Sequence, residues 1–157
     1  RAGAAAGMLA VTSLSAALTM GREAVASYEL FGSGALALSQ WVEESTPPQA
    51  VFLTDTRHNN EVASLEGRNV VCGSPSYLFY HGLPYDKSQR AVQIIYEHPA
   101  DAQPLLEDFG VDYILVSDFE RSSYPVDEAA LDSLYPRVYD DGVRVVYQVT
   151  DKEDDHE

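Results

Sequence analysis

The stretch V111-D-Y-I-L-V-S117 is the strongest strand signal in the chain. It is apolar, rich in β-branched and aromatic residues, and ends at a polar serine. Shorter runs of the same kind occupy residues 50–54 and 69–72. Continuous apolar runs are typical of strands that are covered on both faces. The three runs therefore predict the centre of a sheet that is packed between helices.

Helical segments separate these three strands. The segments 61–67 and 101–110 each end in a glycine, and the segment 88–98 places its apolar residues on one side. Strands that alternate with helices in this order predict parallel pairing through right-handed crossovers. We therefore expect an α/β fold with a mostly parallel, open, Rossmann-like sheet in three layers.

The last third of the chain has a different pattern. A helix is expected at about 127–134, followed by two β-rich runs within R137-V-Y-D-D-G-V-R-V-V-Y-Q-V149. Asp-Gly between such runs is a strong hairpin signal, because both central residues then take positive φ. The sheet is thus expected to finish with an antiparallel hairpin at its edge. The acidic residues 151–157 predict a disordered tail.

The beginning of the chain is uncharged from Ala2 to Met20. A helix of this length approaches the ~20 residues that cross a bilayer. The first residue is Arg1 rather than Met, so we expect a piece of a longer protein or a processed product. Three interpretations stay open, namely the end of a membrane helix (residues 1–21), a secretory signal and a soluble helix. A connector at 22–34 and a soluble α/β domain at 35–150 follow.

The charge balance excludes one class of partner. The chain has 157 residues, with 25 acidic side chains against 10 basic ones and a formal net charge of -15. Such a surface repels phosphate backbones, so we expect no binding of nucleic acid. Strong acidity with so few lysines also suits a halophilic protein, because high salt screens the self-repulsion. An ordinary acidic domain is the alternative.

Polar residues follow each predicted strand, where an open parallel sheet gathers its ligands. These residues are Asp55, Arg57 and His58; Cys72, Gly73 and Ser74; and Ser117, Asp118, Glu120 and Arg121. His58 beside Asp55 or Asp118 would suit acid and base catalysis. Asp55, His58, His81 and Asp118 together offer oxygen and nitrogen donors for a metal ion. Solvated loops have the same composition. The single cysteine excludes an internal disulfide, and a buried structural thiol is favoured over a nucleophile.

The stretch G73-S-P-S-Y-L-F-Y-H-G-L-P-Y85 is unusually rich in aromatic residues. Such a composition is typical of a surface loop that contacts a partner, a sugar or a lipid head group. A loop that is tucked over the edge of the sheet is the alternative.

Five segments occur in an order that resembles a known family. They are W41-V-E-E-S-T-P-P-Q-A-V-F-L-T54, R57-H-N-N-E-V-A-S-L-E-G-R68, the aromatic stretch 73–85, V111-D-Y-I-L-V-S-D-F-E-R121 and Y135-P-R-V-Y139. Together they resemble the soluble C-terminal domain that follows the last membrane helix in multi-pass GT-C glycosyltransferase-like proteins. Those proteins are distantly similar to the catalytic subunit of oligosaccharyltransferase and to protein mannosyltransferases. The resemblance covers about residues 35–149.

This resemblance implies a location and a role. Residues 2–20 would be the last membrane helix, and the domain would lie on the extracytoplasmic or lumenal side. The parent enzymes transfer a sugar from a polyprenyl-phosphate donor, with catalytic carboxylates and metal ligands between early membrane helices. The domain would then hold no cofactor, any divalent metal would belong to the full-length parent, and the domain would contact the rest of the parent's membrane domain.

A domain of this kind would shape the acceptor side of the site and bind a sugar or a lipid-linked sugar. The residues that match recurrent family positions are His58, Arg68, Tyr77, Tyr80, His81, Tyr85, Glu120 and Arg121. The stretch Y77-L-F-Y-H-G82 stands where oligosaccharyltransferases carry W-W-D-Y-G, so recognition of a peptide acceptor is not implied.

Two rival functions remain open. One is a free-standing soluble α/β enzyme, similar to a hydrolase, that uses His58 with Asp55 or Asp118. The other is an interaction module whose acidic face binds a basic partner.

Overall fold

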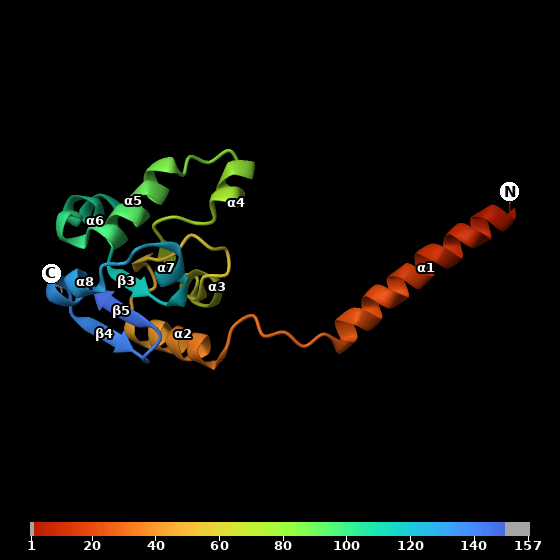
Figure 1. Ribbon diagram of the computed structural model, residues 1–157, viewed down its shortest axis with the longest axis horizontal. Helices are drawn as coiled ribbons and strands as arrows, with labels where there is room; N and C mark the ends of the chain where they lie inside the picture. The colour runs from red at the N-terminus through yellow and green to blue at the C-terminus, as the bar shows by residue number, and fades with distance from the viewer. Residues whose placement is uncertain (1, 150–157) are drawn as a thin grey trace. The chain divides into compact units, whose positions relative to one another are not determined.

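The computed structural model describes residues 2–149 of the chain (Figure 1). The described residues form two compact units, the first ending at Leu30 and the second beginning at Phe31. The first unit contains a long helix and the second contains the sheet, so each is described by itself. The acidic tail expected at 151–157 lies outside the described residues.

Helix α1 (Ala2–Val25) is 24 residues long, and none of its residues is buried. By length and composition it is a candidate membrane span, although a signal sequence near an N-terminus has the same properties. The hydroxyls of Thr12 and Thr19 each donate to a carbonyl four residues earlier, at 3.0 Å. Because these polar groups find partners within the helix, they can enter an apolar environment at low cost.

The second unit is built on a mixed five-stranded sheet in the order β2-β1-β3-β5-β4. The strands are β1 (Val51–Leu53), β2 (Asn69–Val70), β3 (Tyr113–Val116), β4 (Arg137–Asp140) and β5 (Val145–Gln148). Strand β1 pairs in parallel with β2 and β3, whereas β5 pairs antiparallel with β3 and β4. The predicted mostly parallel, Rossmann-like sheet is therefore wrong.

The error in the predicted sheet has a physical cause. Strand β5 is an inner strand with three buried residues, and its register with β3 joins four residue pairs. The parallel pairing of β1 with β2 joins only two. A strand that is covered on both faces is apolar along its length whichever way its neighbour runs. The run 111–117 therefore predicted a central strand but could not show the direction of its partner.

Helices cover both faces of this sheet. They are α2 (Ser33–Ser45), α3 (Glu61–Glu66), α4 (Pro75–Tyr80), α5 (Asp86–Glu97), the 3₁₀ helix η1 (Pro99–Asp101), α6 (Gln103–Phe109), α7 (Asp118–Ser123) and α8 (Glu128–Leu134). Strand residues alternate between the faces, so Leu53 and Ile114 pack with α5 and α6 while Phe52 and Leu115 pack with α2 and α3. Figure 1 shows α5 and α6 on one side of the sheet and α2 on the other.

The hairpin of β4 and β5 is present, but its turn differs from the expected one. Gly142 has φ 85°, whereas no residue other than glycine has positive φ among residues 2–149. The carboxylate of Asp141 accepts the backbone N–H groups of Val143 and Arg144, at 2.9 Å and 2.7 Å. A side chain that mimics a backbone turn therefore closes this hairpin, and Asp141 itself does not take positive φ.

Tyr96, on α5, joins the ends of the two parallel strands from one face of the sheet. Its fully buried hydroxyl lies 2.7 Å from the carbonyl oxygen of Leu115 and 3.2 Å from that of Leu53. Burial raises the pKa of this hydroxyl well above 10, so it remains a proton donor. The hydrogen bond holds the carboxyl ends of β1 and β3 against α5.

Replacing Tyr96 with Phe is expected to lower the free energy of unfolding by about 1–3 kcal/mol, because buried carbonyls lose their donor. Urea unfolding of the chain in mild detergent can be followed by the fluorescence of Trp41, which packs against Tyr113 and Tyr139. The matched control is Tyr80→Phe, because the Tyr80 side chain is 83% exposed. Equal stability of the two variants would contradict this role.

Candidate functional site

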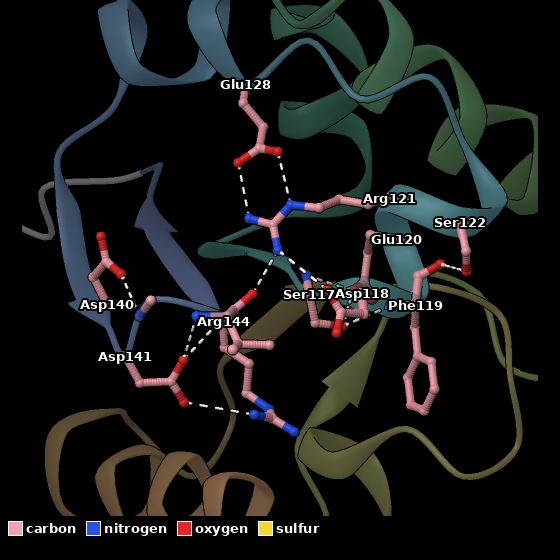
Figure 2. A network of polar contacts seen from close by, with 12 residues as sticks. Ser117, Asp118, Phe119, Glu120, Arg121, Ser122, Glu128, Asp140, Asp141 and Arg144 are labelled. Carbon is pink, nitrogen blue, oxygen red and sulfur yellow. Dashed lines mark hydrogen bonds and ion pairs between the residues drawn. The ribbon is translucent and has the colours of Figure 1, made fainter.

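The segments that follow β1 and β3 meet at one edge of the sheet, as expected for neighbouring parallel strands. Glu120, on α7, is fully buried there. One of its carboxylate oxygens accepts the backbone N–H of Asp55 at 2.7 Å. The other accepts the backbone N–H of Ser117 at 2.8 Å and the Ser117 hydroxyl. Figure 2 shows Ser117 and Glu120 at the start of α7.

These contacts form a capping box, in which the Glu120 side chain accepts the backbone N–H of Ser117 and the Ser117 side chain accepts that of Glu120. The Ser117 hydroxyl also accepts the backbone N–H of Phe119 at 3.1 Å. Burial raises the pKa of the Glu120 carboxyl above its ordinary value, and the hydrogen bonds that the carboxylate accepts limit this rise. The carboxylate is thus occupied by the protein itself and joins the end of β1 to α7.

Asp55 is also buried and fully engaged. One carboxylate oxygen accepts the backbone N–H of Arg57 at 2.6 Å, and the other accepts the Ser123 hydroxyl at 2.6 Å. The Arg57 guanidinium lies 3.6 Å from the same carboxylate and 4.6 Å from the centre of the Phe119 ring. These contacts close the edge of the sheet and leave Asp55 in a structural role.

His58 lies farther out along the same segment. Its ring is 5.8 Å from the ring of Tyr77, on α4, and the Tyr77 side chain is 56% exposed. Within residues 2–149, no hydrogen bond or ion pair joins the His58 ring to Asp55 or Asp118. The Asp118 carboxylate is 82% exposed and lies 3.9 Å from Arg121. An accessible imidazole beside a phenol can bind a polar ligand and stack on a sugar ring.

The Arg121 side chain links three parts of the fold (Figure 2). Its guanidinium donates two hydrogen bonds to Glu128 on α8, at 2.8 Å and 2.9 Å, and a third to the Val143 carbonyl in the hairpin. This pairing raises the pKa of Arg121 and lowers that of Glu128. Arg121 thus ties α7 to α8 and to the hairpin.

The remaining predicted site residues lie in several places. Arg68 donates to the carbonyls of Val42 and Thr46, both at 3.2 Å, and so caps the end of α2. Tyr80 is exposed on α4, and His81 follows at the end of this helix. Tyr85 is half-buried against the core. Of the eight predicted residues, the structure brings His58 into contact with Tyr77, and Glu120 and Arg121 share α7.

One buried pair had no signal in the sequence. The Arg144 guanidinium in the hairpin lies 3.1 Å from the Glu61 carboxylate at the start of α3, 83 residues away in the chain. Arg144 also lies 3.6 Å from Asp141. Figure 2 shows these two side chains facing each other. The second Glu61 oxygen and the Asn60 amide nitrogen have no hydrogen-bond partner in the described part of the chain.

No group of three or more His, Cys, Asp or Glu side chains within residues 2–149 is arranged to hold a metal ion. A surface hollow of about 300 Å³ is lined by α6, by the residues just before β3 and by Val149. A second hollow, of about 340 Å³, is lined by α5 and Leu105. Neither hollow includes His58, Tyr77 or Glu120. The contact between His58 and Tyr77 is therefore a surface feature outside these two hollows.

No known family model matches this sequence, and no curated protein matches it. The resemblance to the GT-C glycosyltransferase-like proteins remains a prediction that rests on the sequence segments themselves.

Proposed function

We propose that this chain is the membrane-anchored, extracytoplasmic accessory domain of a polytopic glycosyltransferase-like protein. In this role it shapes the acceptor side of a site that uses a polyprenyl-phosphate sugar donor. It does not transfer the sugar itself. The observation that carries this proposal is α1, an apolar helix without buried residues that precedes a compact sheet unit.

The edge of the sheet supports a role without catalysis. Its two buried carboxylates, Asp55 and Glu120, both accept hydrogen bonds from neighbouring backbone and side-chain groups. A general base must instead reach a proton of the substrate. The exposed contact of His58 with Tyr77 is suited to binding, because an aromatic face packs on a sugar ring while the imidazole reaches a hydroxyl.

Anchorage is tested by extracting membranes that contain the natural full-length protein with alkaline carbonate. We expect the protein to stay in the membrane pellet, because a spanning helix resists this treatment. Release of the whole protein into the supernatant would refute the anchoring role.

Acceptor binding is tested with His58→Ala and Tyr77→Ala in the full-length protein, using a polyprenyl-phosphate sugar as the donor. Both variants are expected to raise the KM for the acceptor about tenfold and to leave the KM for the donor unchanged, because they remove binding contacts. The control is His98→Ala, an exposed histidine at the end of α5. Unchanged KM values in both variants, or sugar transfer by residues 1–157 alone, would contradict the proposed role.

A further inference from the structure

Four exposed apolar side chains gather on α4 and on the turn that follows it. Tyr77, Phe79, Tyr80 and Leu83 are 56%, 65%, 83% and 53% exposed, and we name them the α4 patch. Other exposed large apolar residues of the sheet unit, such as Leu134, are separated along the chain. The α4 patch is therefore a concentrated apolar surface on an otherwise acidic domain.

The fold holds the α4 patch outward. Leu78 packs against the core cluster, and its carbonyl accepts the backbone N–H of Leu83 at 2.9 Å. Gly82 takes φ 68°, which allows the chain to turn back at this point. The rings of Phe79 and Tyr80 contact each other edge to face at 5.5 Å. The apolar side chains are thus presented by a fixed turn.

The charge distribution indicates what covers this patch. Residues 69–85 contain no Asp, Glu, Lys or Arg, although the chain has 25 acidic and 10 basic side chains. Tyrosine and phenylalanine beside an uncharged turn suit the interface of a bilayer, where apolar rings enter the boundary and hydroxyls stay in the head groups. The rest of the acidic surface is repelled by anionic lipid.

The connector adds a geometric argument. Seven residues, 26–32, join the last residue of α1 to the first residue of α2. Eight Cα–Cα steps separate these two residues, so an extended connector spans at most about 29 Å. If α1 crosses a bilayer, this connector tethers the sheet unit to the membrane, where the exposed apolar side chains of the α4 patch gain free energy by leaving water.

We propose that the α4 patch inserts into the head-group boundary of the bilayer that α1 spans. This inference rests on the proposed membrane anchorage. The insertion places the contact of His58 with Tyr77 at the level of the lipid head groups. The same domain thereby gains a second attachment to the membrane and a fixed orientation.

The test uses the full chain in vesicles of zwitterionic phosphatidylcholine, with and without bromine on the acyl chains. An environment-sensitive fluorophore is attached at one introduced cysteine, in a Cys72→Ala background. Three positions are compared, namely Ser13→Cys in α1, Ser76→Cys on α4 and Ser133→Cys on α8. Ser76 and Ser133 are both exposed, and Figure 1 shows α4 and α8 in different parts of the sheet unit.

We expect brominated lipid to quench the fluorophore at Ser13→Cys and Ser76→Cys by at least about twofold and to leave Ser133→Cys unchanged. Adding Phe79→Ser, Tyr80→Ser and Leu83→Ser should remove quenching at Ser76→Cys alone. Quenching in α1 without quenching at Ser76→Cys would overturn the docking proposal and leave the anchorage intact. The same result is expected if the α4 patch binds another protein instead of lipid. No quenching in α1 would overturn both.

Discussion

Replacing Glu120 with Ala is expected to lower the free energy of unfolding by about 4 kcal/mol, because two backbone N–H groups and one hydroxyl lose a charged acceptor in a buried site. These donors are the N–H groups of Asp55 and Ser117 and the Ser117 hydroxyl. The substitution also cuts the link between β1 and α7. Urea unfolding followed by Trp41 fluorescence measures the loss.

Two further variants separate this buried network from the general properties of α7. Asp118→Ala changes a carboxylate of the same helix that is 82% exposed, so stability should change by no more than about 0.5 kcal/mol. Glu120→Gln keeps the size and one acceptor oxygen, and is expected to lose about 2 kcal/mol. If Glu120→Ala were as stable as Asp118→Ala, the buried carboxylate would not hold this edge of the sheet.

The difference in stability between the natural chain and Glu120→Gln is also predicted to depend on pH. Burial raises the pKa of Glu120 in the folded chain above 4.5, so the folded state binds this proton more tightly than the unfolded state. The resulting stabilisation is fully present below pH 4.5 and is lost as the pH rises through the folded pKa. The Glu120→Gln variant lacks this stabilisation, because a glutamine side chain does not titrate. The stability advantage of the natural chain over this variant should therefore be larger at about pH 4 than at about pH 8. A constant difference would contradict the raised pKa.

Local signals in the sequence predicted several features correctly. Gly67 and Gly110 end α3 and α6 with φ 62° and 61°, because only glycine takes this conformation without a steric penalty. The N-terminal apolar helix and the hairpin at 137–148 are also present. The capping box S117-D-F-E120 also has a recognisable spacing, so the structural role of Glu120 was predictable from the sequence. Such features depend on neighbours within a few residues.

Features that depend on distant residues were not predictable. The direction of β5 beside β3 is set by packing across the sheet, and both directions leave a buried apolar strand. The contact of His58 with Tyr77 requires the segment after β1 to meet α4. The spacing of residues in a single sequence does not show which distant segments come into contact. The candidate site could therefore be predicted as a group of strand ends and an aromatic stretch, but not as a set of contacts.

The ion pair of Glu61 with Arg144 is the clearest case of a distant contact with an energetic consequence. The two side chains are 4% and 18% exposed, and they join α3 to the hairpin. Water cannot fully solvate either charge, so Glu61 depends on Arg144, whereas Arg144 also pairs with Asp141 at 3.6 Å. Gly34, on α2, leaves the space for this pair, because a Cβ there would lie 2.6 Å from an Arg144 nitrogen.

Replacing Arg144 with Met is expected to lower the free energy of unfolding by about 3 kcal/mol, because it leaves the Glu61 carboxylate buried without a counter-charge. Replacing Glu61 with Leu should cost less, because Arg144 keeps Asp141 as a partner at 3.6 Å. The double variant should cost less than the sum of the two, with a coupling energy of about 1–3 kcal/mol, because neither charge is then left alone. The control cycle uses Lys87→Ala and Asp108→Ala, an exposed pair at 2.7 Å, for which the coupling should stay below about 1 kcal/mol. Equal coupling energies in the two cycles would show that burial does not strengthen the interaction of Glu61 with Arg144.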